Sequence, residues 1–331
     1  MLAAMAPRMI AEGSRPSIPS IAPSATSGSG PRPKLNVIAV VWNDSVQISH
    51  FYERARSTLE QLADVDWDLI FVNNDSQDDS LARLLDLRAT DERVKILTLS
   101  RNFGYHAALI AGLSTTDADL YAMVDVDCED PPELLTDLFA RIRSGSQLAY
   151  GVRSDRDELW PMTLGRRLFY IVNGLLADSA MVMWLGEFAM MTRQVRDAII
   201  APQTTYPFLR AEMCYVGFRA VGLPYRRARK RVGRSHYNAW RLTQFAVAGI
   251  LSGTTFPLRF ILYLSIALGL ALPVASFIFR LGLDEVVKLA VIAIFYHLLL
   301  SLSIIALYLA RTYRNVIARP VFVIDRSQTF L

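Results

Sequence analysis

The stretch LYAMVDVDCEDPPE, residues 120–133, decides the fold. Its first five residues are apolar and typical of a buried strand. Asp125, Asp127 and Glu129 follow at alternate positions, and Asp130 precedes two prolines, which is the pattern of a helix start with Asp130 as the N-cap. A strand, an acidic segment and a helix start in this order are typical of an α/β domain, where ligands bind beyond the carboxyl ends of the strands.

The same alternation of strand and helix extends to both sides of this stretch. Short apolar runs predict strands over residues 35–41, 67–72, 94–99, 120–124 and 148–152. Helical patterns cover residues 45–62, 79–87, 106–113 and 131–144. We therefore expect an α/β fold with a mostly parallel, Rossmann-like sheet and helices on both faces.

Polar side chains follow four of the predicted strands. They are Asn43 and Asp44 after the first strand, Asn73, Asn74 and Asp75 after the second, Arg101 and Asn102 after the third, and the acids from Asp125 to Asp130 after the fourth. Because the carboxyl ends of parallel strands meet at one edge of a sheet, these groups predict a single ligand site.

The acids at positions 125, 127 and 129 predict a metal site. On an extended segment, alternate residues project to the same side, so the carboxylates of Asp125, Asp127 and Glu129 would repel one another without a cation between them. Oxygen ligands suit Mg²⁺ or Mn²⁺, and Mg²⁺ is commonly completed by substrate phosphates and water. The alternative interpretation is a solvated acidic loop.

Two long apolar segments predict a membrane hairpin near the C-terminus. Residues 260–279 and 289–310 contain no Asp, Glu, Lys or Arg, and each is long enough to cross ~30 Å of hydrocarbon. The turn expected between them, residues 280–288, holds few basic residues, whereas the outer flanks hold many. The positive-inside rule therefore predicts an integral protein of the cell inner membrane, with its main domain and both termini in the cytoplasm.

Charge and composition indicate which classes of partner the protein binds. The net charge of +4 over 331 residues is too small to indicate nucleic acid, but seven Arg or Lys and no acid lie between Arg226 and Arg241. Such a cluster beside apolar segments favours a phosphate group or an anionic lipid surface. Residues 1–34 have the composition of a disordered tail, and residues 161–185 predict either an amphipathic helix at the membrane surface or an ordinary packed helix.

The acidic stretch resembles a known family signature. Residues 125–133 are similar to the Asp-Ala-Asp-Leu-Gln-Asp-Pro-Pro-Glu motif of family 2 glycosyltransferases, in particular the dolichyl and polyprenyl-phosphate sugar synthases such as the bactoprenol glucosyltransferases. The likeness continues at residues 100–104, 186–188, 216–218, 233–237 and 256–259, and it covers about residues 35 to 322 in the family's order. It implies a GT-A nucleotide-binding domain, an interface region and two membrane helices.

The resemblance implies roles for particular residues. The catalytic candidates are Asp127, Glu187 and Arg101, and the metal candidates are Asp125, Asp127 and Glu129. The nucleotide-binding candidates are Trp42, Asn43, Asp44, Asn73, Asn74, Asp75 and Asp125. The candidates for the acceptor phosphate are Arg226, Arg227, Arg229, Arg234, Ser235 and Arg311. Several positions depart from the family pattern, among them Asn73 and Asn74 in place of two aspartates, Ala189 in place of an arginine and His236 in place of a lysine.

Together these features predict a membrane glycosyltransferase. It would use Mg²⁺ or Mn²⁺ to transfer a sugar, with inversion, from a UDP- or GDP-sugar to a polyprenyl phosphate, with the lipid bilayer and a possible homo-oligomer as further partners. The expected domains are a tail over 1–34, the GT-A domain over 35–240, a juxtamembrane helix over 241–259, a transmembrane hairpin over 260–310 and a cytoplasmic tail over 311–331. The alternatives are a processive polysaccharide synthase, a catalytically weak membrane scaffold that binds nucleotides, and a lipid flippase, for which two helices are too few.

Overall fold

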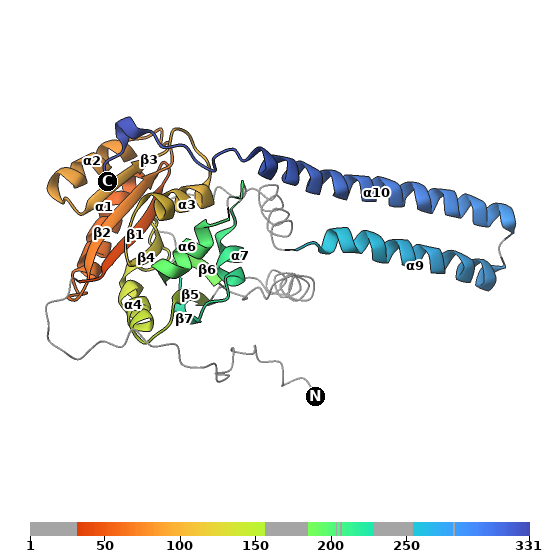
Figure 1. The fold of residues 1–331 in the computed structure, drawn as a ribbon, viewed down its shortest axis with the longest axis horizontal. Coiled ribbons are helices and arrows are strands. Elements are labelled where there is room, and N and C mark those ends of the chain that lie inside the picture. The colour runs from red at the N-terminus through yellow and green to blue at the C-terminus, as the bar shows by residue number, and fades with distance from the viewer. Residues whose placement is uncertain (1–31, 156–184, 203, 206, 228–253, 281) are drawn as a thin grey trace.

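The computed structural model describes residues 32–155, 185–202, 204–205, 207–227, 254–280 and 282–331 (Figure 1). Almost all of the predicted N-terminal tail and of the predicted amphipathic helix over 161–185 lies outside these residues, and so does most of the basic cluster. The juxtamembrane helix predicted over 241–259 lies outside them up to residue 253.

The described part of the domain is built on a seven-stranded sheet with the order β3-β2-β1-β4-β6-β5-β7. The strands are β1 (Lys34–Val41), β2 (Asp66–Asn73), β3 (Val94–Thr98), β4 (Leu120–Asp125), β5 (Leu148–Asp155), β6 (Leu185–Thr192) and β7 (Ala220–Arg226). The strands from β3 to β4 are parallel, whereas β6 runs antiparallel to both of its neighbours. The prediction of a mostly parallel α/β sheet is confirmed, and sequence reasoning missed β6 and β7.

Helices cover both faces of the sheet. They are α1 (Ser45–Leu59), α2 (Ser80–Thr90), α3 (Tyr105–Thr115), α4 (Leu135–Arg143), α6 (Arg193–Ile200) and α7 (Leu209–Tyr215), with a short 3₁₀ turn, η1 (Pro132–Leu134), before α4. Buried residues of α1, α2 and α4 join one hydrophobic cluster, and those of α3, α6 and α7 join a second. The four helices predicted from the sequence are confirmed, with ends that differ by a few residues.

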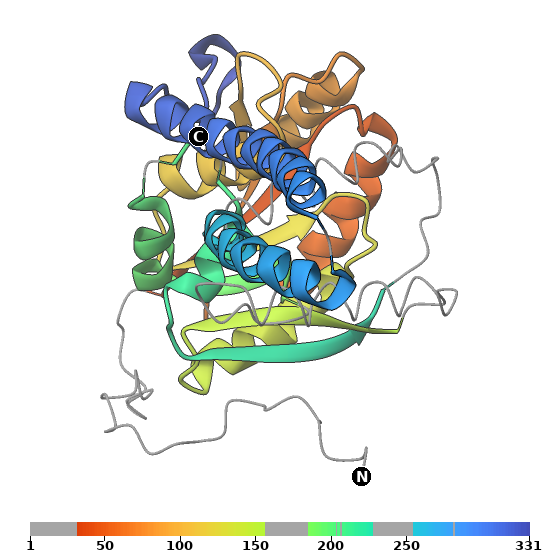
Figure 2. The ribbon, with the colours of Figure 1, turned by 90° about the vertical axis from the view of Figure 1, so that its right-hand side faces the viewer.

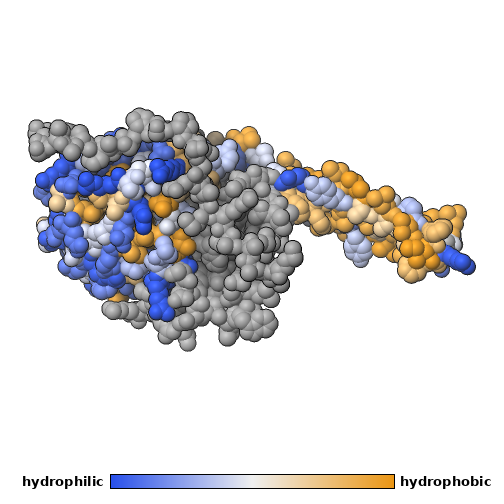
Figure 3. Space-filling view, turned by 90° about the horizontal axis from the view of Figure 1, so that it is seen from below, coloured by the Kyte–Doolittle hydropathy of each residue, from blue (hydrophilic) through white to orange (hydrophobic). Residues whose placement is uncertain are grey.

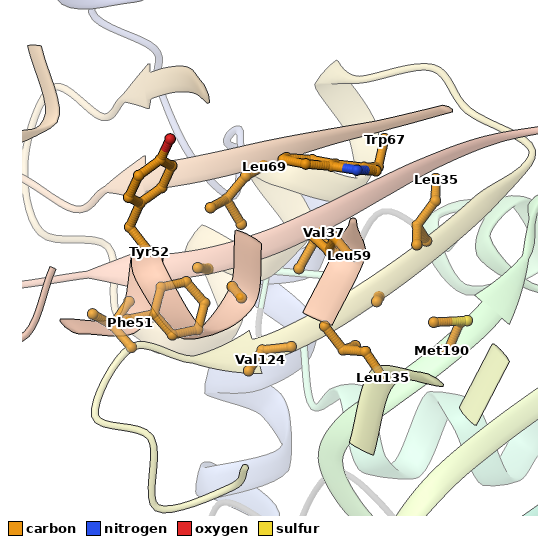
Figure 4. Close-up of a cluster of buried hydrophobic side chains, with 14 of the residues drawn as sticks. Leu35, Val37, Phe51, Tyr52, Leu59, Trp67, Leu69, Val124, Leu135 and Met190 are labelled. Carbon is orange, nitrogen blue, oxygen red and sulfur yellow. The ribbon is translucent and has the colours of Figure 1, made fainter. Parts of the chain in front are cut away.

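Alternation along β1 explains why two cores form. Leu35 and Val37 pack into the first cluster, shown in Figure 4, while Ile38, the next residue along the strand, points to the opposite face and packs into the second. All three are fully buried, and each such side chain contributes about 1.5–3 kcal/mol of hydrophobic stabilisation. Gly112 lets α3 approach closely, since a Cβ there would lie 2.6 Å from Cγ2 of Ile38. This contact fixes the N-terminus of α3 beside the carboxyl ends of the strands.

Two long helices project from the domain as a hairpin. They are α9 (Phe256–Phe279) and α10 (Leu283–Ile317), which lie side by side in Figures 1 and 2. Their surface is largely apolar (Figure 3), and Phe277, for example, is 86% exposed. At 24 residues, α9 extends about 36 Å, which is enough to cross a bilayer. Both helices are long and apolar enough to span a membrane.

The hairpin differs from the sequence prediction in its bounds. The connection between the helices is shorter than the predicted 280–288, because α9 ends at Phe279 and α10 begins at Leu283. A capping interaction accounts for this early start, as Glu285 accepts a hydrogen bond from the Gly282 N–H. Farther along, Oγ of Ser265 on α9 lies 2.8 Å from Nε2 of His297 on α10 and joins the two helices. After α10 the chain returns to the domain, where residues 324–330 lie along β3 and Leu99.

Candidate functional site

The candidate site lies where β1, β2 and β4 end at one edge of the sheet. Three residues just beyond these strands have left-handed backbones: Asn43 with φ 55°, Asp75 with φ 58° and Cys128 with φ 54°. This conformation is uncommon for residues other than glycine, and such residues cluster at functional sites. The sequence prediction that these strand ends share one edge is confirmed by the parallel pairing of β1 with β2 and β4.

Hydrogen bonds join the turn after β1 to the turn after β2, where most of the nucleotide-binding candidates lie. The Asn43 N–H donates to Oγ of Ser76 at 3.1 Å, and Oδ1 of Asn43 accepts from the Gln77 N–H at 2.7 Å. Oδ1 of Asn73 accepts from the Ser76 N–H at 3.1 Å. Asp44, at the start of α1, donates its N–H to Oγ of Ser80. These bonds hold the two strand-end turns together as one wall.

The residues of this wall differ in solvent exposure. Trp42, directly after β1, is 45% exposed, Asn43 is also exposed and Asp75 is half-buried, whereas Asn73 is buried. A large exposed aromatic ring can contact a flat polar ring such as a nucleobase.

Asn74 organises the loop that follows β3. Its Nδ2 donates to Oδ1 of Asn102 at 3.1 Å, and its Oδ1 accepts from the Phe103 N–H at 3.0 Å. A carboxylate cannot make the first of these bonds, because it has no hydrogen to donate. The loop also carries Arg101, whose guanidinium lies 4.0 Å from the centre of the Phe103 ring. Asn74 is 2% exposed, so its contacts assign it to the support of this loop.

Asp125, the last residue of β4, is half-buried and lies near other carboxylates. Burial raises its pKa to about 7, and repulsion from Asp130, Asp127 and Glu187 adds to the rise. The Tyr105 hydroxyl donates a 2.5 Å hydrogen bond to Oδ1 of Asp125, which opposes the shift. The ionised form of Asp125 therefore needs positive charge near it.

The segment after Asp125 turns sharply, so the prediction of an extended segment was wrong. The Cys128 N–H donates to the Asp125 carbonyl oxygen at 3.3 Å, and the Glu129 N–H donates to Oδ1 of Asp127 at 3.1 Å. Cys128 adopts the left-handed conformation that this turn requires. Alternate residues therefore do not project to the same side. Among the residues that the structure describes, no group of three His, Cys, Asp or Glu side chains is positioned to hold a metal ion.

Two carboxylates of this turn nevertheless fit a metal that is completed by substrate. Asp125 and Asp127 offer hard oxygen atoms, and their mutual repulsion is the kind that a divalent cation relieves. One or two carboxylates, with phosphate oxygens and water, are the usual ligands of Mg²⁺ in nucleotide sites. Glu129 is engaged elsewhere, because its Oε2 lies 2.5 Å from Nη2 of Arg227.

Asp130 does not cap a helix, contrary to the sequence prediction. Residue 131 takes the cap position of η1, and no side chain caps it. Asp130 is instead 1% exposed, and it accepts hydrogen bonds from the Tyr225 hydroxyl and, at 2.9 Å, from Arg153. These partners come from β5 and β7, so Asp130 fastens the acidic turn to the far half of the sheet.

The acceptor-phosphate candidates are only partly described. Arg226 ends β7, and Arg227 reaches the acidic turn through its ion pair with Glu129. Arg311 lies on α10, one turn after Tyr308, which donates to the Thr254 carbonyl oxygen at 2.7 Å. Arg229, Arg234 and Ser235 lie outside the described residues. One predicted acceptor residue and one predicted metal residue are thus in direct contact.

Glu187 is brought to the acidic turn by the antiparallel strand β6. The antiparallel pairing of β4 with β6 ends at Met123 and Ala189, and beyond it the charge of Glu187 acts on Asp125. Both oxygens of Glu187 accept hydrogen bonds from Arg210, at 2.6 Å from Nε and 2.5 Å from Nη2. Nε2 of His106 lies 3.9 Å away. Burial raises the pKa of Glu187, but the charge of Arg210 and these hydrogen bonds outweigh burial and hold the pKa below its usual value.

Sequence reasoning missed Tyr105, His106 and Arg210. Tyr105 and His106 begin α3, shortly after the Arg101–Asn102 pair. Their position just beyond the end of a strand is the feature of the sequence that could have indicated a role in the site. Burial lowers the pKa of His106, and the charge of Arg210 lowers it further, against the pull of Glu187. Arg210 lies on α7, in a region where no element was predicted.

Comparisons with known proteins agree on one family. The family model described as glycosyl transferase family 2 matches residues 37–198. An uncharacterized glycosyltransferase of Synechocystis sp. is 31% identical over 302 residues, which cover 88% of this chain and 95% of the relative. A prophage bactoprenol glucosyl transferase homolog of Escherichia coli is 28% identical over 312 residues, which cover 88% and 99%.

Solved structures give a more distant likeness. A mannosyltransferase from Pyrobaculum calidifontis, solved in complex with GDP-Man and Mn²⁺, is 14% identical to this chain. The alignment covers 87% of this chain and 76% of the mannosyltransferase, with a TM-score of 0.46.

Proposed function

Because this chain belongs to glycosyl transferase family 2 and is a glycosyltransferase of the bactoprenol glucosyltransferase-like group, we propose that it transfers a sugar from a nucleotide-diphosphate sugar to a polyprenyl phosphate. The observation that carries the proposal is the contact of an acidic turn with a basic residue, in a chain that also carries an apolar hairpin. Asp125 and Asp127 suit the donor side, and Arg227, in contact with the same turn, suits the acceptor side.

The acidic turn would hold the donor diphosphate through a divalent cation. When bound to Asp125 and Asp127, Mg²⁺ or Mn²⁺ would offset negative charge on the departing nucleoside diphosphate. The wall formed by the β1 and β2 turns, with Trp42 and Asp75 facing outward, would contact the nucleoside. Arg101, on the loop that Asn74 supports, lies on the same edge of the sheet and can pair with a phosphate oxygen.

The acceptor needs positioning more than it needs a base. A phosphate ester has a second pKa of about 6, so its attacking oxygen is already largely ionised near neutral pH. That oxygen would form the new bond to the anomeric carbon as the bond from this carbon to the diphosphate oxygen breaks, with inversion. Glu187 is held as an anion by Arg210, so it would accept a hydrogen bond from a sugar hydroxyl and orient the ring.

The hairpin would bring the lipid acceptor to this site. The apolar surfaces of α9 and α10 suit a bilayer, and the domain lies at the end of the hairpin where α10 finishes. Arg311 and Arg314 lie on this last part of α10, and Arg319 follows it. This bias of basic residues supports a cytoplasmic domain, with the start of α10 on the opposite side of the inner membrane. The wider domain organisation, with a GT-A unit over residues 35–240 before the hairpin, forms part of this proposal.

The orientation can be tested by labelling single cysteines in intact cells. A membrane-impermeant maleimide should label Gly282→Cys in the hairpin turn without permeabilisation. It should label Asp137→Cys, on the exposed side of α4, only after permeabilisation. Labelling of the two sites in the reverse order would overturn the proposed orientation.

The activity can be tested with a matched pair of aspartate variants. Asp127→Ala removes a carboxylate of the acidic turn, whereas Asp137→Ala removes an exposed carboxylate on α4. Loss of several kcal/mol of charge stabilisation should lower metal-dependent transfer by about 100-fold or more in Asp127→Ala. Asp137→Ala should match the wild type. Substantial transfer by Asp127→Ala in Mg²⁺ or Mn²⁺ would contradict the assignment of the donor side.

A further inference from the structure

The C-terminal segment, residues 319–331, forms a layer along the outer edge of β3. Phe330 pairs with Ile96, through hydrogen bonds of 2.8 and 2.7 Å between their main chains, and Ile324 pairs with Leu99. Between these pairs, the Thr98 hydroxyl donates to the Gln328 carbonyl oxygen at 2.7 Å. An edge strand offers unpaired main-chain groups, and this segment bonds those of Ile96 and Thr98 in β3.

The same segment reaches the loop that supports the donor side of the site. The Ser100 N–H donates to the Val323 carbonyl oxygen at 2.9 Å, one residue before Arg101. Phe322 and Ile324 pack against the hydrophobic cluster to which Phe103 also belongs. The segment therefore contacts both the backbone at the start of this loop and the apolar core beneath it.

The opposite side of the loop is held by contacts already described. Asn74 bonds Asn102 and the Phe103 N–H, and Tyr105, which closes the loop and packs on the same hydrophobic cluster, donates to Asp125. A continuous series of contacts thus joins the C-terminal segment to the carboxylate that ends β4. The segment also follows α10 directly, with Ala318 in a left-handed turn between them.

We propose that residues 322–330 are a positioning element of the donor site, which fixes the loop over residues 100–105 and couples it to the end of the membrane hairpin. The proposal rests on the proposed function only where it names the donor. Its structural content, that the segment holds this loop, can be tested whatever reaction the protein catalyses. A role limited to covering the edge of β3 would protect β3 and leave the loop beyond Ser100 unaffected.

Amide hydrogen exchange on the full-length protein in detergent separates these two roles. Ile324→Asn replaces a half-buried side chain of the segment, and Val323→Asn replaces its neighbour, which is 45% exposed. We expect Ile324→Asn to speed exchange of the Phe103 and Gly104 amides by about tenfold, through easier local opening, while β1 and β4 keep their protection. Val323→Asn should leave the loop unchanged. Unchanged exchange at Phe103 and Gly104 in Ile324→Asn would overturn the proposal.

A truncation with rescue gives a second, independent test. A chain that ends at Arg319 keeps the whole hairpin but lacks the segment, and it should show the same faster exchange at Phe103 and Gly104. A synthetic peptide of residues 320–331, added in excess, should restore protection. If the truncated chain does not fold, Ile324→Asn alone decides.

Kinetics connect the segment to the donor. With a donor that the wild type uses, Ile324→Asn should raise the donor KM by about tenfold and change the acceptor KM little, because the loop borders the donor side. If the wild type transfers no sugar, the proposed function fails while the exchange result still stands. If the wild type is active and Ile324→Asn keeps its donor KM, the coupling to the donor site is wrong.

Discussion

Replacing Arg210 by glutamine tests whether an ion pair holds Glu187 in the site. Arg210 makes two hydrogen bonds to Glu187, at 2.6 and 2.5 Å, and the two side chains are 28% and 10% exposed. Removing one partner of a buried pair costs about 3–5 kcal/mol, because the other charge is left buried without compensation. Since Arg210 retains some exposure, we expect a smaller loss of about 2–3 kcal/mol, at or below the lower limit of this range.

The pH dependence of this loss follows from the pKa of Glu187. In the wild type the pKa lies below its usual value, so the pair stabilises the protein at neutral pH and this contribution is lost as acid protonates Glu187. In Arg210→Gln, burial is no longer outweighed and raises the pKa of Glu187. The variant then carries an unpaired buried charge at pH 7–8 but a neutral carboxyl at lower pH. The stability gap between the two proteins should therefore be widest at pH 7–8 and narrow toward pH 5.

Thermal unfolding of the detergent-solubilised protein across this pH range provides the assay. A loss of 2–3 kcal/mol corresponds to a fall in Tm of roughly 5–10 °C at pH 7.5 for a domain of this size. Arg193→Gln is the matched control, because its pair with Asp117 is exposed to solvent and its loss should change the Tm little. Arg210→Gln should also lower kcat, since Glu187 loses its fixed orientation. An unchanged Tm at pH 7.5, or a gap that widens in acid, would refute this reasoning.

Two further predictions concern other residues of the site. Asn74→Asp should raise the donor KM by about tenfold, because a carboxylate cannot donate to Asn102. The control is Asn315→Asp on α10, which keeps the oxygen that accepts from the Thr205 N–H and should change the donor KM little. Equal effects of the two variants in steady-state kinetics would contradict the assignment of Asn74. Asp125→Asn should abolish transfer and yet raise the Tm of the metal-free protein at pH 8. The pKa of Asp125 is raised to about 7, so ionisation of this carboxyl destabilises the folded state as pH rises from about 4 to 7. Asparagine cannot ionise and so removes this cost. A lower Tm in Asp125→Asn would contradict this account.

The parallel half of the sheet could be predicted because its strands carry local signals. β1, β2 and β4 are nearly continuous apolar runs, which is typical of parallel strands buried on both faces, and each ends in polar residues. The apolar helices α9 and α10 are equally clear from composition. Local pattern was sufficient here because burial and secondary structure depend on the same neighbouring residues.

The contacts that complete the site depend on pairings that are distant in sequence. β6 lies between β4 and β5 and runs antiparallel to both, so nothing near Glu187 in the sequence indicates that it lies beside Asp125. Asp130 resembled a helix cap because prolines follow it. Its carboxylate instead accepts hydrogen bonds from Arg153 and Tyr225, which are distant in sequence. The acids of the turn also failed to project to one side, since Cys128 takes a left-handed conformation that the alternating pattern does not reveal.

The C-terminal segment shows the same limit. Its composition indicated only a tail after the second apolar helix, and α10 in fact continues to Ile317 before the chain returns to β3. Main-chain pairing with an edge strand leaves little trace in the side chains, because the hydrogen bonds come from the backbone.

The measurement that tests the central claim most directly is sugar transfer by the purified full-length protein. The protein in detergent would be incubated with polyprenyl phosphate, Mn²⁺ or Mg²⁺ and a panel of labelled UDP- and GDP-sugars, and the label in the lipid phase would be counted. We predict that label from at least one donor enters the lipid phase, that it requires both polyprenyl phosphate and the metal, and that Asp127→Ala abolishes it. A folded wild-type protein that binds nucleotide but moves no label from any donor of the panel into the lipid phase would contradict the claim.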